Sequence, residues 1–172
     1  MKHFLFAICC LALCSVAASA GTTKAPMNDQ KFLDIAAQTD MVDANLGQLA
    51  KGVGGTESVK DFGQMLVTDH THDFEQLQSL AKQTGLTVPT AIDTERDKTT
   101  IAPMHALKGN AFDHKYIQDM VAGHEDAVAL YKKEAKDAES PAIRSYAEDT
   151  LATLQKHLAD AKAIEQGKTP SM

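Results

Sequence analysis

Ionisable side chains interrupt the apolar faces of four segments that carry a helical period. On a wheel of 100° per residue, one such side chain falls inside each apolar arc; these are Asp43, His70, His124 and His157. Imidazole nitrogens together with a carboxylate suit a transition metal such as zinc, copper, iron or nickel. Two further acids, Asp69 and Asp73, lie within or beside the arc of His70, and we expect them to hold that ring in one tautomer.

The four side chains also lie at similar depths along their helices. Counted from the turn near Gly54 with a full-length crossover, their positions differ by about 5 residues, or ~8 Å at the helical rise. They can therefore share one layer of a bundle, which predicts a metal site. The alternative is structural, because buried His and Asp can hydrogen-bond one another and so satisfy polar groups that would otherwise destabilise a core.

The other histidines of the helical region carry no such signal. His72 and His114 point away from the apolar stripes, and His105 lies between helices. No nucleophile–base pairing and no cofactor-binding loop can be recognised, so we do not expect an enzyme.

Four long segments must position the candidate ligands, and all have the 3.6-residue period of amphipathic helices. We expect these helices at 28–51, from 56 or 58 to 85, at 111–139 and at 140–167. Asn110 is the expected N-cap of the third, Ser140-Pro141 opens the fourth, and Gly85 ends the second. Strand signals are nearly absent, which predicts an all-α fold.

A stretch of about 25 residues, from Gly85 to Asn110, separates the second and third helices, which is unusually long for a connection. Such a length suits a ferritin-like four-helix bundle, in which a long crossover joins two hairpins. One or two short helices are expected within 93–108. The bundle domain should span 28–167, with a flexible segment at 21–27 before it and a frayed tail at 168–172.

The first twenty residues have the pattern of a secretory signal peptide. Lys2 is followed by an apolar run over 4–16 and then by Ala18-Ser19-Ala20, which a signal peptidase accepts. Cleavage after Ala20 would place the protein in the periplasm or outside the cell. A lipid anchor through Cys14 is the weaker alternative, because Leu13 stands where a small residue is expected.

Composition excludes some classes of partner. The 172 residues carry a net charge of -6, which argues against nucleic acid, because phosphate binding needs clustered Lys and Arg. After the leader, no apolar run is long enough to span a bilayer. All three cysteines (Cys9, Cys10 and Cys14) lie in the leader, so the mature chain has no disulfide. A homo-oligomer and an unidentified envelope partner both remain open.

Several short motifs resemble those of an uncharacterised bacterial extracytoplasmic family. They are Met41-Val42-Asp43 with Leu46-Gly47-Gln48-Leu49-Ala50, Val59-Lys60-x-Phe62, Met65 through Asp69-His70-Thr71, Phe112-Asp113-x-x-Tyr116, Met120-Val121-x-x-His124, and Leu151-x-x-Leu154-x-x-His157-Leu158. The family is domain of unknown function 4142, often labelled an outer-membrane protein. The resemblance covers roughly residues 28–165 and implies a ferritin-like helical bundle in the cell envelope with no established activity. The family commonly has Glu where this chain has Asp43.

A di-iron centre is not expected despite this resemblance. Such a centre needs a Glu-x-x-His pair on two helices, whereas Val67 and Leu154 stand three residues before His70 and His157. The sequence therefore predicts an envelope helical bundle that binds a transition metal, or else an interaction or stress-protection module whose histidines are structural.

Overall fold

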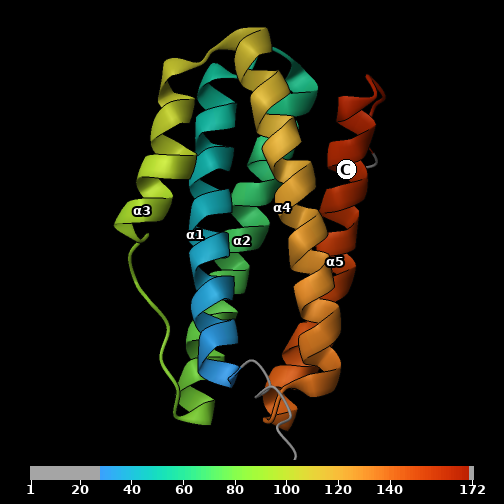
Figure 1. The fold of residues 1–172 in the computed structure, drawn as a ribbon. Helices are drawn as coiled ribbons and strands as arrows, with labels where there is room; N and C mark the ends of the chain where they lie inside the picture. Colours follow the sequence, from blue (N-terminus) through green and yellow to red (C-terminus); the bar gives the residue numbers. More distant parts are fainter. Residues whose placement is uncertain (1–27, 171–172) are drawn as a thin grey trace, which may run out of the picture.

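The computed structural model describes residues 28–170, and within them every regular element is a helix (Figure 1). The leader, Cys14 and the segment 21–27 lie outside the described residues. The elements in order are α1 (Asp29–Val53), α2 (Glu57–Thr84), α3 (Thr94–Arg96), η1 (Asp97–Ile101), η2 (Ala102–Ala106), α4 (Gly109–Asp137) and α5 (Pro141–Glu165). This confirms the predicted all-α class. None of the helices in the described range is long and apolar enough to cross a membrane.

Two helical hairpins, α1–α2 and α4–α5, stand side by side (Figure 1). The connection between them returns along α1 through α3, η1 and η2, so α4 begins near the turn that joins α1 to α2. Gly54 and Gly109 pair there in a single isolated bridge. The long crossover between the second and third long helices is therefore present as predicted.

Capping interactions set the helix ends, and one acidic side chain at a helix start also joins the two hairpins. The Asn28 side chain accepts from the Gln30 amide at the start of α1, and Gly85, at φ 73°, ends α2 in the left-handed conformation. Asp29 accepts the amides of Glu139 and Ser140 at 2.9 and 2.8 Å, which ties the start of α1 to the start of α5.

One predicted cap is wrong. Asn110 does not cap α4, because the helix already begins at Gly109 with Lys108 at the N-cap position and no side-chain cap bond. The acid three residues further on, Asp113, reaches across instead and accepts the amides of Gly55 and Thr56 at 2.8 and 3.0 Å. It therefore links the two hairpins at the end opposite Asp29.

A polar layer divides the core into two apolar clusters. One cluster includes Phe32, Leu77, Tyr131 and Leu154, and the other includes Leu46, Phe62, Tyr116 and Met120. Along each long helix one buried ionisable group falls between members of the two clusters; these groups are Asp40, His70, His124 and His157, and Asp43 follows Asp40 by three residues. Burial of apolar side chains therefore stabilises the bundle on both sides of the polar layer.

Two glycines let α1 and α2 approach closely. A Cβ on Gly63 would lie 2.7 Å from the Gly47 carbonyl oxygen and 2.8 Å from the Ala50 Cβ. We expect Gly63→Ala to lower the free energy of unfolding by about 1–3 kcal/mol, because the helices must separate. Gly52→Ala is the matched control, since a Cβ there meets nothing within 4 Å, and it should stabilise α1 by about 0.5–1 kcal/mol. Urea unfolding of both variants measures this, and equal stabilities would contradict the close packing.

Candidate metal centre

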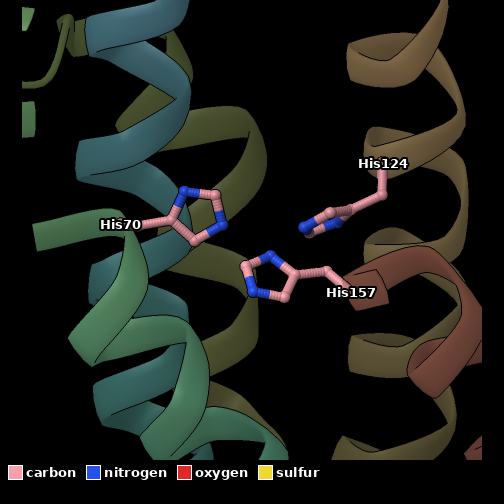
Figure 2. A group of neighbouring side chains, drawn as sticks. All are labelled: His70, His124 and His157. Carbon is pink, nitrogen blue, oxygen red and sulfur yellow. The ribbon is translucent and has the colours of Figure 1, made fainter. Parts of the chain in front are cut away.

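Three histidines from three different helices meet in the polar layer. His70 comes from α2, His124 from α4 and His157 from α5, and each is at most 2% exposed. Their ring centroids are 5.7 Å (His70–His124), 5.3 Å (His70–His157) and 5.3 Å (His124–His157) apart. Figure 2 shows the three rings turned toward one another. One nitrogen of each ring lies within 4.8 Å of the other two, so the structure brings together the three predicted imidazoles.

Each ring is held through one of its two nitrogens. His70 Nδ1 donates to Asp40 Oδ1 at 2.9 Å, and His157 Nε2 donates to Asp69 Oδ2 at 2.9 Å. His124 Nδ1 lies 2.9 Å from the Met120 carbonyl oxygen, which can only accept, so this nitrogen carries the proton. Each anchor fixes the ring orientation and the tautomer of the neutral ring.

The second nitrogen of each ring is left with no hydrogen bond. His70 Nε2, His124 Nε2 and His157 Nδ1 are buried and have no hydrogen-bond partner within residues 28–170. Buried polar atoms without a partner are rare, because leaving one unpaired costs about 1–3 kcal/mol. Three in one cluster therefore require an explanation beyond packing. In the neutral tautomers set by the anchors, all three carry a lone pair.

The acids around the cluster are arranged differently from the prediction. Asp69 pairs with His157 rather than with His70, while Asp73 interacts with Tyr146 and Thr150, which act to lower its pKa against the effect of burial. Asp43 Oδ2 lies 3.6 Å from His70 Nε2, beside the cluster, and its carboxylate is not in the group of mutually close donor atoms. All three acids thus lie at or near the layer, in separate roles.

Asp40 is the residue that the sequence reasoning missed. It is 2% exposed and holds His70, with its second oxygen unpaired within the described chain. The signal was available, because Asp40 follows Ala36 by four residues and precedes Asp43 by three, which places it on the buried face of α1.

Burial and charge separate the protonation states of the three rings. Burial lowers the pKa of His70, but the hydrogen bond that His70 donates to Asp40 and the charges of Asp43, Asp40 and Asp73 outweigh it and raise the pKa to about 9. Burial lowers the pKa of His124, and burial together with the charge of His70 lowers the pKa of His157 to about 4. Near neutral pH the cluster therefore holds one imidazolium and two neutral imidazoles.

The same burial acts on Asp40. It raises the pKa of the Asp40 carboxyl to about 7, against the opposing hydrogen bond and charge of His70. Because the pKa of Asp40 lies below that of His70, the proton that the pair shares rests on His70. The metal-free layer thus keeps a positive charge on His70, next to two neutral donors.

The spacing is close to that of a metal site. Two nitrogens bound at 2.0–2.1 Å to a tetrahedral metal lie about 3.3 Å apart. The three ring nitrogens, within 4.8 Å of one another, would need to move together by at most about 1.5 Å for each pair. Side-chain rotation about the fixed helices can supply a shift of this size.

Comparison with known proteins finds similar folds among solved structures. CopM in the Ag-bound form, the Cu(II)-bound form and the Cu(I)-bound form each align with a TM-score of 0.63. Sequence identities are 16%, 16% and 17%; each alignment covers 81% of this chain and 96%, 97% and 96% of the respective CopM chain. At such identities the likeness shows a shared helical fold. No curated protein sequence matches the chain.

The family relationship is given by the sequence itself. The family described as "Domain of unknown function (DUF4142)" matches residues 14–164, which is most of the chain. That range contains all four long helices and the three clustered histidines. The chain therefore belongs to the DUF4142 family.

Proposed function

We propose that this protein binds one copper ion in the cell envelope through His70, His124 and His157. The observation that carries the proposal is the set of three inward ring nitrogens, one from each of three helices, with no hydrogen-bond partner within the described residues. A cation at their centre would accept all three lone pairs at once. Asp43, 3.6 Å from His70 Nε2, would supply a fourth ligand after a small rotation.

The donor set allows several metals and favours copper. Imidazole binds zinc, copper, iron and nickel, and among divalent ions copper gives the highest affinity for a given nitrogen site. CopM, which shares the fold, is described in Ag-, Cu(I)- and Cu(II)-bound forms. A signal peptide over residues 1–20 would deliver the site to the periplasm, where it would sequester or buffer the ion.

The histidine anchors support this function over a structural role for the cluster. If the imidazoles were only core hydrogen-bonding groups, both nitrogens of each ring would be expected to find partners. Here one nitrogen is held by a carboxylate or a carbonyl and the other is unpaired, which is the pattern of a metal-ligating histidine.

Titration of the metal-free, leader-less protein with Cu(II) tests the proposal. We expect one ion per chain and nitrogen hyperfine structure in the electron paramagnetic resonance spectrum. At a free-ion concentration about 100-fold above Kd, binding should stabilise the fold by about 2.7 kcal/mol. Parallel titrations with Zn(II) and Ni(II) rank the metals. If no ion raises the melting temperature and none binds with nitrogen ligation, the proposal is wrong.

A further inference from the structure

A groove between α2 and α5 joins the surface to the histidine cluster. Its volume is about 270 Å³, and His70 and His157 line its inner end. Exposed residues line its mouth, among them Asp149 and Thr153 of α5 and His72 of α2. Both inner histidines are at most 2% exposed and keep an unpaired ring nitrogen. The groove therefore gives solvent a path toward two of the three proposed ligands.

The walls of this groove are negatively charged. Asp69, Asp73 and Asp149 line it, and among the described residues that line it none is lysine or arginine. Asp69 connects the outside with the cluster, because its side chain is 38% exposed while its carboxylate accepts a bond from His157. A cation in the groove meets carboxylates first and imidazoles next, and such a cleft concentrates cations at its inner end.

A second cavity approaches the layer from the opposite side, between α1, α4 and the crossover. It is larger, about 390 Å³, and four carboxylates line it, those of Asp40, Asp43, Asp119 and Asp126. Of the three histidines only His70 lines it, and the guanidinium of Arg96 from the crossover stands in it. This cavity therefore offers one of the three imidazoles instead of two, beside the carboxylate of Asp43, and it places a positive charge on the path of a cation.

We infer that copper loads through the α2–α5 groove, and that Asp69, Asp73 and Asp149 form an outer capture site for the ion. The inference rests on the proposed function, since it describes how the same histidines are reached. It assigns a role to acids that lie outside the set of ligands, and it excludes the cavity behind the crossover as the main route.

A blocked groove tests the route. Thr153→Phe places a ring in the mouth of the groove, and Gly123→Phe places the same ring in the opposite cavity, where a Cβ meets nothing within 4 Å. Mixing with Cu(II) is followed through quenching of the three tyrosines, because the chain has no tryptophan. Thr153→Phe should slow both loading and release to excess chelator by at least about tenfold, with one ion still bound at equilibrium. Gly123→Phe should change both rates by less than about twofold.

A charge change tests the capture site without adding bulk. Asp149→Asn removes one exposed carboxylate from the groove, and Asp126→Asn removes one from the opposite cavity. At low salt Asp149→Asn should slow loading about three- to tenfold, and the difference should vanish at high salt. Asp126→Asn should leave the rate of loading unchanged.

The outcomes separate this inference from the proposed function. A wild-type protein that binds no ion overturns both. If the wild-type protein binds copper, the route alone is overturned by either of two results. One is that Gly123→Phe slows loading as much as Thr153→Phe, and the other is that Asp126→Asn slows it as much as Asp149→Asn. Circular dichroism of each variant establishes that it is folded, and if Thr153→Phe does not fold, the pair of Asp variants decides.

Discussion

Replacing His124 by leucine is expected to lower the affinity for copper by at least about 100-fold, because loss of an outer hydrogen-bond partner alone costs 10–100-fold in metal sites. His124 is one of three proposed ligands, and its Nδ1 bonds only to the carbonyl of its own helix, at Met120. Its removal therefore leaves no partner side chain unpaired. The metal-free variant should be at least as stable as the wild type, since a buried unpaired nitrogen is replaced by an apolar group.

Weaker copper binding without a loss of metal-free stability distinguishes a ligand from a structural histidine. A structural His124 would lose stability on replacement, with or without metal. The measurement is the melting temperature of the metal-free and copper-loaded forms, together with competition against a copper chelator. His114→Leu is the control, because His114 is an exposed histidine of the same helix. An unchanged copper affinity in His124→Leu would contradict the proposed site.

The three histidines could be predicted from the sequence because helical periodicity fixes which face of a helix each side chain occupies. His70, His124 and His157 lie among apolar residues spaced at three and four positions, and those apolar faces could only point inward. The crossover was predictable for a similar reason, since its length allowed the second hairpin to start at the far end of the first. The inward position of the histidines and the presence of the crossover both follow from the helical period and the segment lengths in the sequence.

The partners of the histidines could not be predicted in the same way. Asp69 is adjacent to His70 in sequence, yet it faces α5 and holds His157. His70 instead takes Asp40 from α1, thirty residues earlier. Which acid meets which ring depends on the rotation and axial register of α1 against α2 and of α2 against α5. These follow from packing, including the close approach at Gly63, and a helical wheel contains no such information.

The ends of the helices also depend on contacts that local sequence does not predict. Asn110 is a favourable N-cap by residue type, but α4 begins before it, at Gly109, which has a positive φ of 56° and pairs with Gly54 of the first hairpin. Asp113, the fifth residue of α4, then accepts the amides of Gly55 and Thr56 in the neighbouring turn. A contact between hairpins therefore decides where this helix starts, against the local preference for a capping side chain.

Asp40→Asn is expected to change both the strength of copper binding and its dependence on pH. In the wild type the pKa of His70 is raised to about 9, so below this pH copper must displace a proton from His70. The apparent affinity should therefore rise with pH by up to about tenfold per unit until pH passes the pKa of His70, and then level off. About one proton per ion should be released at about pH 7.5.

The amide of the variant can still accept the bond from His70 Nδ1, but it carries no charge. Because burial lowers the pKa of His70 and Asp40 opposes this effect, the pKa of His70 must fall in the variant.

Proton release should then decrease at neutral pH, and the pH dependence should level off at a lower pH. Above the pKa of His70, copper affinity should be 10–100-fold weaker than in the wild type, at roughly the cost of losing a carboxylate partner. Calorimetry in buffers of different ionisation enthalpy counts the protons, and Asp61→Asn, an exposed acid of α2, controls for net charge. An unchanged proton count in Asp40→Asn would mean that the displaced proton does not come from His70, and that the Asp40–His70 pair does not prepare this ring for the metal.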